Sequence, residues 1–185
     1  MTHLHDQVRH DAVCNAGKPD GKRTESEWFV DGGWWRPHTA GMDIEELKAR
    51  YLNLEFDRKD FEIEPERAAE VAVLSGETRP ELVDPTHADF TVPHAYLASL
   101  ASGRHLPIDF PKLGGLPIDG GKAVTCHKPV RPNQTLTGRT HLHDIYDKTG
   151  RSGRMIFLVS RMELYDADGQ HLATSDSKMI IRERS

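Results

Sequence analysis

Two Asp/Gly turns in the last third of the chain constrain its fold more than any other feature. Asp147–Gly150 and Asp166–Gly169 each join two runs that are rich in β-branched and aromatic residues. Turns of this composition between such runs predict antiparallel hairpins that continue as a meander. With one further β-rich run before them, the expected strands lie at 120–130, 135–146, 154–165 and 170–182.

The third of these runs contains the continuous apolar stretch Ile156–Val159. An apolar run without alternation is typical of a strand that is covered on both faces. We therefore expect the strand at 154–165 to lie in the middle of the sheet.

The chain before the meander reads as helices with one strand among them. Asp43 and the acids after it indicate a helix start, and Phe61 and Ile63 share one face of a predicted strand. Pro65 begins a second helix, which Gly76 ends. A third helix is rich in small residues, which favours burial. An α+β fold is predicted, an antiparallel sheet wrapped around a buried helix, and the elements before the meander are helix 43–51, strand 54–63, helix 65–74 and helix 93–101.

Length and composition fit one globular domain. The chain has 185 residues and a formal net charge of -5, and single domains usually have ~100–200 residues. Lys and Arg outnumber Asp and Glu in residues 122–185 but not in the rest of the chain. This basic region could hold a phosphorylated ligand. The acidic whole, without a dense basic run, argues against nucleic acid as a partner.

Other features of the sequence bear on its compartment. No apolar run approaches the ~18 residues that a membrane helix needs, and the N-terminal residues lack the apolar core of a secretory signal. The two cysteines, Cys14 and Cys126, are too few for a disulfide scaffold. A cytoplasmic protein without a membrane partner is the expectation.

Residues 1–41 differ from the rest of the chain. They contain all three tryptophans and show no sustained periodicity. We interpret them as a Trp-rich extension of a single domain at 42–185. Because each tryptophan buries a large apolar area, the extension is expected to pack on the domain or on a partner subunit.

Three stretches carry a family likeness: VPHAYLASL at 92–100, the long run at 127–158 that begins HKPVRPNQTLTG, and LYDADGQHLATS at 164–175. They resemble the MaoC-like dehydratase family, in particular its N-terminal, fatty-acid-synthase-type dehydratase domain. The first stretch matches the start of the family's central helix, and the second its His-Arg-Pro and Pro-Gly-Asp motifs. The third matches the hairpin that closes the sheet. The resemblance implies the hot-dog fold over 43–183.

The same resemblance implies an acyl thioester as substrate, held on coenzyme A or on a carrier protein, and no cofactor. The implied reaction is the reversible hydration of a trans-2-enoyl thioester to a 3-hydroxyacyl thioester. This chemistry needs an acid/base pair and a donor to the thioester oxygen. Near the start of the helix at 93–101, the expected substrate-binding residues are His94, Ala95 and Tyr96. Lys128 and Arg131 are candidates for contacts with phosphate.

The loop SGETRPELVDPTHA at 75–88 departs from the family pattern at its chemistry. Active members have Gly-Asp-x-Asn-Pro-aliphatic-His-x-Asp, in which the first Asp and the His form the acid/base pair. Here Glu77 replaces that Asp, and Leu82 replaces that His. Leucine has no titratable group. The frame of the loop is kept at Gly76, Pro80, Asp84 and Ala88.

Three interpretations follow from this loop. The chain is the non-catalytic half of a two-part dehydratase, whose second hot-dog chain supplies Asp and His. Alternatively it is a stand-alone hydratase that has recruited Glu77, Asp84, His87 or His94. The third alternative is a hot-dog thioesterase or an acyl-thioester-binding module.

A metal site is not expected. His141 and His143 share a strand face, but zinc needs a third and a fourth ligand, and nothing else is suitably spaced. Cys126 on a predicted strand is interpreted as a small core residue. Because an open sheet edge exposes unpaired backbone groups, we expect a homodimer or a complex with a second hot-dog subunit.

The extension provides a test of this expectation. Deleting residues 1–41 should weaken assembly more than folding, because we expect the three tryptophans to contact a partner subunit. Sedimentation gives the oligomer mass, and thermal unfolding gives the stability of the domain. An oligomer of unchanged mass and affinity after the deletion would contradict the assignment.

Overall fold

The computed structural model describes residues 43–151 and 153–183, so the predicted extension at 1–41 lies outside the described residues. The described chain contains four helices and five strands. In chain order they are α1 (Ile44–Tyr51), β1 (Glu55–Glu62), α2 (Pro65–Leu74), α3 (Pro80–Val83), α4 (His94–Ser99), β2 (Leu116–Cys126), β3 (Thr135–Gly150), β4 (Gly153–Tyr165) and β5 (His171–Arg182).

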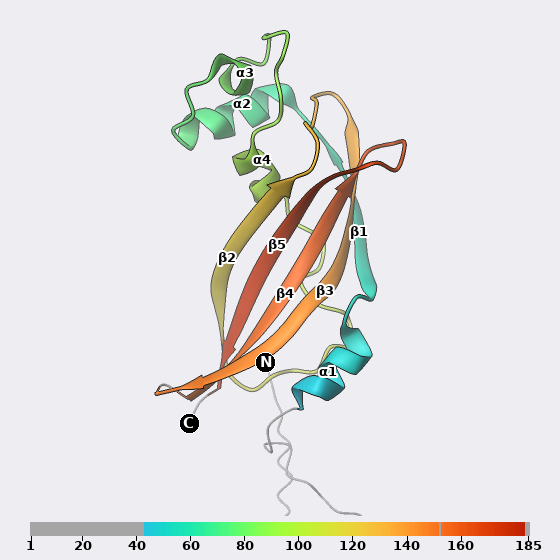
Figure 1. Ribbon diagram of the computed structural model, residues 1–185, viewed down its shortest axis with the longest axis vertical. Helices are drawn as coiled ribbons and strands as arrows, with labels where there is room; N and C mark the ends of the chain where they lie inside the picture. The colour runs from blue at the N-terminus through green and yellow to red at the C-terminus, as the bar shows by residue number, and fades with distance from the viewer. Residues whose placement is uncertain (1–42, 152, 184–185) are drawn as a thin grey trace, which may run out of the picture. The chain divides into compact units, whose positions relative to one another are not determined.

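The five strands form one antiparallel sheet in the order β1-β3-β4-β5-β2 (Figure 1). β4 pairs with β3 on one side and with β5 on the other, so the predicted central position of this strand is confirmed. α2, α3 and α4 gather at one end of the sheet, and α1 lies at the other (Figure 1). The α+β architecture predicted from the sequence is confirmed.

Local sequence accounts for the first two helices. The Asp43 side chain accepts a hydrogen bond from the Glu45 amide at 3.0 Å and so caps α1. Pro65 occupies the first turn of α2, where its missing N–H costs nothing. Gly76 follows α2 with φ of +82°, a left-handed conformation that a side chain disfavours. Both helices therefore begin and end as the sequence predicts.

The turn predicted at Asp147–Gly150 is wrong, because β3 continues to Gly150 and pairs there with Gly153. Two cross-strand contacts extend the ladder beyond the predicted end. Arg154 Nε donates to Asp147 Oδ2 at 2.6 Å, and the Lys148 ammonium lies 5.6 Å from the ring centroid of Phe157. The second turn is correct, since Asp166 Oδ1 accepts from the amides of Asp168 and Gln170.

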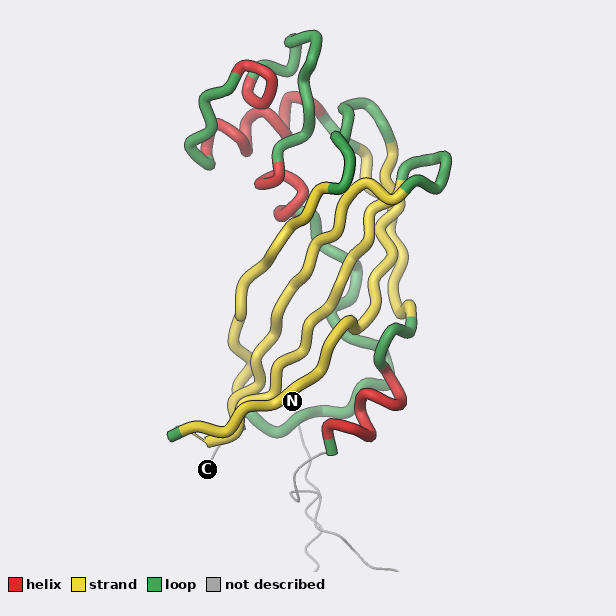
Figure 2. Tube along the Cα trace, viewed as in Figure 1, coloured by secondary structure: helices red, strands yellow, loops and turns green. Residues whose placement is uncertain are grey.

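The predicted helix at 93–101 is shorter, and β2 starts earlier than the predicted strand at 120–130. Lys122 Nζ, from β2, donates to the carbonyl oxygens of Ala98 at 2.9 Å and Leu100 at 3.1 Å. From β1, Asp57 Oδ2 accepts from the Gly103 amide at 2.7 Å. These side chains hold the chain in an irregular path, and the long loop after α4 runs along the sheet (Figure 2).

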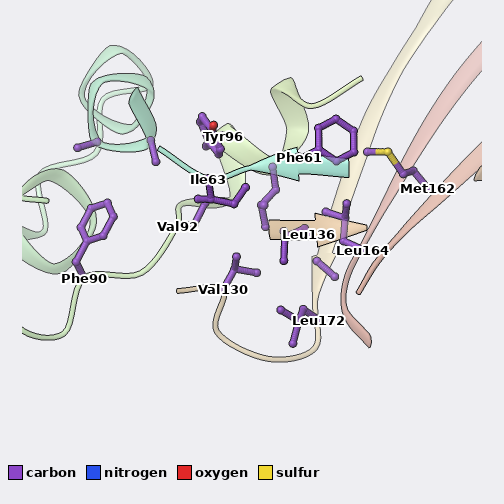
Figure 3. Close-up of a cluster of buried hydrophobic side chains, with 14 residues drawn as sticks. Phe61, Ile63, Phe90, Val92, Tyr96, Val130, Leu136, Met162, Leu164 and Leu172 are labelled. Carbon is purple, nitrogen blue, oxygen red and sulfur yellow. The ribbon is translucent and has the colours of Figure 1, made fainter. Parts of the chain in front are cut away.

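Two hydrophobic clusters stabilise the domain. The larger one joins α2, α4, β1, β3, β4 and β5, and Figure 3 shows Tyr96 of α4 and Phe61 of β1 among its side chains. Phe61 and Ile63 are both buried, as predicted for one face of that strand. The second cluster packs α1 against β3, β4 and β5. Among the described residues, no helix is long and apolar enough to cross a membrane.

The larger cluster is packed so tightly around Gly138 of β3 that it leaves no room for a side chain there. A Cβ atom at this position would lie 2.8 Å from Phe61 Cε2 and 3.0 Å from Met162 Sδ. We expect Gly138→Ala to lower the free energy of unfolding by about 1–3 kcal/mol, because neighbouring side chains must shift.

Gly150→Ala is the matched control, because nothing lies within 4 Å of a Cβ atom at that position. Its free energy of unfolding should stay within about 0.5 kcal/mol of the original protein. Urea unfolding measures both variants, and equal losses in the two would contradict the packing argument.

Candidate functional site

A cavity of about 620 Å³ lies between the loop after α2, the start of α4 and the segment that follows β2. Its apolar lining includes Ala72, Leu82, Val92 and Val130. Its ionisable side chains are those of Glu77, Arg79, His94, Cys126, His127 and Lys128. The cavity therefore brings the loop after α2 and the start of α4 together with a segment much later in the sequence, 126–130.

The loop that carries the family pattern is held against the end of α2. Ser75 Oγ donates to the carbonyl oxygen of Val71 at 2.8 Å, and the Glu77 amide donates to that of Ala72 at 3.0 Å. Between them, Gly76 takes its left-handed conformation. The sequence pattern of this loop thus places Glu77 on the cavity wall.

The carboxylate of Glu77 is bound by Arg79, two residues further along the chain. Arg79 donates to Glu77 through Nε at 3.1 Å and through Nη2 at 2.8 Å. The amides of Thr78 and Arg79 donate to the same carboxylate at 3.0 and 3.2 Å. The side-chain hydrogen bond from Arg79 and these two amides lower the pKa of Glu77 from 4.5 to about 2. Near neutral pH, this carboxylate is a poor proton acceptor.

Leu82 stands on the cavity wall in the place where the family pattern has its histidine. It belongs to the short helix α3, which the sequence did not predict, and its amide donates to the Arg79 carbonyl at 2.9 Å. The Thr91 amide donates to the Glu81 carbonyl at 3.0 Å and joins α3 to the chain before α4. Backbone hydrogen bonds therefore hold the segment around Leu82 in place.

Asp84 and His87, two of the candidate catalytic residues, do not line the cavity. Asp84 Oδ1 accepts from Thr86 Oγ1 at 2.7 Å and from the Thr86 amide at 2.9 Å, and both bonds lower the pKa of Asp84. His87 Nδ1 accepts from the Asp89 amide at 3.2 Å. Both side chains therefore accept hydrogen bonds within the turn in which they lie.

The candidate substrate-binding residues divide into two groups. His94, Ala95 and Lys128 line the cavity. Tyr96 is buried in the larger hydrophobic cluster, as Figure 3 shows, and Arg131 Nη1 donates to the Phe90 carbonyl at 3.3 Å. The substrate contacts assigned to these five residues stay predictions.

Two further residues on the cavity wall, Cys126 and His127, were not among the candidates. Burial raises the pKa of the Cys126 thiol, so it is uncharged near neutral pH. His127 Nε2 lies 3.1 Å from Thr174 Oγ1, and its ring centroid is 4.5 Å from that of His171. Pro129 was the sequence signal that could have pointed to this wall. Proline cannot donate a hydrogen bond to a sheet, so it indicates that the strand ends before it, close to Cys126 and His127.

The described part of the cavity contains no acid/base pair of the family type. One carboxylate is fixed by an arginine, and a leucine replaces the imidazole. Within residues 43–151 and 153–183, no three side chains of His, Cys, Asp or Glu are placed to hold a metal ion. The cavity can bind a group, but it lacks the Asp and His that the family pattern pairs for proton transfer, and its imidazoles are those of His94 and His127.

The contact between Arg79 and Glu77 predicts a measurable pH effect. A lowered pKa in the folded state stabilises the protein above pH 4.5, and this stabilisation is lost as the pH falls toward 2. In Arg79→Gln, the pKa of Glu77 should rise toward 4.5. NMR titration of the Glu77 carboxyl carbon measures it.

Arg67→Gln, on the exposed face of α2 and away from the cavity, is the matched control. It should leave the pKa of Glu77 unchanged. The assignment fails if Glu77 titrates at the same pH in the Arg79→Gln variant and in the original protein.

Comparisons with known proteins address the family. A family model described as "FAS1-like, dehydratase domain region" matches residues 52–175. A search of curated proteins found no match.

Two solved structures show the same fold, and a third is similar over much of this chain. A MaoC-like dehydratase from Phytophthora capsici is 20% identical with a TM-score of 0.55, and the match covers 74% of this chain and 49% of that one. The ChsH1–ChsH2 complex from Mycobacterium tuberculosis has a chain that is 14% identical with a TM-score of 0.51, with 77% and 90% covered. A truncated HadBC 3R-hydroxyacyl-ACP dehydratase complex from the same organism is 17% identical with a TM-score of 0.49, with 70% and 99% covered.

The family match spans the segment from the end of α1 to the middle of β5, and so includes the whole cavity. The sheet order and the position of the helices agree with the hot-dog fold expected from the sequence. The chain therefore belongs to the FAS1-like dehydratase-region family, and its domain has the hot-dog fold.

Proposed function

We propose that this chain is the non-catalytic, substrate-binding subunit of a MaoC-like enoyl-thioester hydratase, and that a second hot-dog chain supplies the acid/base pair. The observation that carries the proposal is the pair of substitutions on the cavity wall. Leu82 replaces the histidine of the family pattern, and the carboxylate of Glu77 is held by Arg79.

The reaction explains why these two positions matter. Hydration of a trans-2-enoyl thioester adds a hydroxyl group to C3 and a proton to C2. One group must take a proton from water while another delivers a proton, and each must have a suitable pKa. A leucine can do neither, and a carboxylate with a pKa of about 2 is a weak base. A homodimer would repeat the same deficiency, so the partner must differ from this chain.

An open sheet edge supports a partner of the same fold. β2 is at the end of the strand order, and its residues from Leu116 to Ala123 are exposed. Such an edge leaves backbone N–H and C=O groups free to pair with another strand. The ChsH1–ChsH2 neighbour is itself a complex of two named chains. In the proposed enzyme, the two sheets would join along β2.

The stand-alone alternative has less support from the geometry. Asp84 and His87 lie outside the cavity lining and are bound within their own turn. Glu77 lines the cavity but would first have to separate from Arg79. The substrate in this proposal is a coenzyme A or carrier-protein thioester.

The isolated chain should not hydrate crotonyl-CoA, since it lacks the acid/base pair. Co-expression with a hot-dog chain that retains Asp and His in the family loop should restore hydration. The loss of enoyl absorbance measures the reaction, and co-purification measures the association.

Two results would contradict this function. Hydration by the isolated chain that is abolished in Glu77→Gln would favour the stand-alone enzyme. Release of free thiol from acyl-CoA, detected with a thiol reagent, would favour the thioesterase. A partner variant without its histidine is the control, and it should be inactive in the complex.

A further inference from the structure

The cavity has an excess of positive charge. Its one carboxylate, Glu77, is already paired with Arg79. Lys128 lines the same cavity, and its ammonium forms no ion pair with any described residue. His94 and His127 add two imidazoles, and no further acid from the described residues lines the cavity. An anionic group that enters would find a free counter-ion and hydrogen-bond donors.

Few large aliphatic side chains form the apolar part of the wall. Of its larger aliphatic side chains, Val92 and Val130 are 4% and 2% exposed, so they offer little surface to a ligand. Leu82 is half-buried, and the remaining apolar residues are alanine and proline. A long fatty chain gains its affinity from the apolar area that it buries. The wall is therefore better suited to a short acyl group than to a long one.

The position of this cavity in the reaction follows from the proposed function, on which this inference rests. In that proposal the partner holds C2 and C3 at its own acid/base pair, so this cavity receives a part of the substrate that is remote from them. Two anionic parts qualify, a carboxylate at the far end of the acyl group and the phosphates of coenzyme A. Phosphate is best bound by free arginine forks, and the only arginine of the lining is engaged by Glu77.

We propose that the cavity binds the terminal carboxylate of a short dicarboxylic acyl thioester. Lys128 is the counter-ion, and His94 and His127 donate hydrogen bonds to the carboxylate or to water beside it. The substrate class is then an enoyl thioester with a carboxyl group at its far end. Recognition of this group selects the acyl chain, and the partner's residues perform the hydration.

The test compares glutaryl-CoA with pentanoyl-CoA, which have five-carbon acyl groups and differ in the terminal carboxylate. The full chain is titrated with each ester and with free coenzyme A in a calorimeter. Glutaryl-CoA should bind at least about tenfold more tightly, the size of one charge-assisted hydrogen bond. Lys128→Gln should remove this preference and leave the affinity for pentanoyl-CoA and for free coenzyme A unchanged.

Two further variants separate the role of Lys128 from general effects of charge. Lys178→Gln, on β5 and outside this cavity, removes the same charge and should keep the tenfold preference. His94→Gln, at the exposed start of α4, should reduce the preference without changing the unfolding temperature.

The outcomes distinguish this inference from the proposed function. Equal affinities for the two esters would overturn the carboxylate site and leave the subunit role intact. An equal loss of affinity for free coenzyme A in Lys128→Gln would identify phosphate as the anion and would also overturn it. If neither ester nor coenzyme A binds to the chain or to its complex with a catalytic partner, the proposed function itself fails.

Discussion

The pairing of β4 with strands on both of its sides is the constraint on which the rest of the structure depends. Because β4 pairs with β3 over its whole length and with β5 over most of it, its backbone groups are satisfied within the sheet. The strand period of two then sends Leu158, Met162 and Leu164 to one face, where they are buried. The helices pack against this face.

The cavity follows from where those helices end. α2 and α4 pack over one end of the sheet, and the chain between them must return across that end. The Val92 amide bonds to the Val130 carbonyl at 2.9 Å, and the amides of His127 and Lys128 bond to the Leu172 carbonyl. These backbone bonds hold the cavity walls in place without any contribution from the side chains of Leu82 or Glu77. A scaffold of this kind can keep its shape while its proton-transfer residues change.

The structure agrees with the part of the family pattern that sets the shape of the loop. Gly76 takes a left-handed conformation, and the loop lies against the cavity as the resemblance implied. The side-chain identity at position 82 is also clear from the sequence, and a leucine there has no proton to transfer. The sequence could not show that Arg79 binds Glu77, since two residues so close in a loop contact each other only in particular backbone conformations. It also missed His127, whose place on the cavity wall depends on a contact with β5 far along the chain.

Local patterns in the sequence determined the strands, the first two helices, the Asp166–Gly169 turn and the departure of Leu82 from the family pattern, which has a histidine there. Each of these depends on residues that are neighbours in the chain, through alternation, capping, turn chemistry or side-chain identity. Only the tertiary structure decided the end of α4, the true end of β3, and the union of Glu77, His94 and Lys128 around one cavity. The end of α4 and the cavity depend on contacts between distant segments, such as that of Lys122 with the carbonyls of Ala98 and Leu100. The end of β3 depends on cross-strand contacts within one hairpin, such as that of Arg154 with Asp147. The hydrophobic periodicity of a sequence does not indicate which distant segments contact one another.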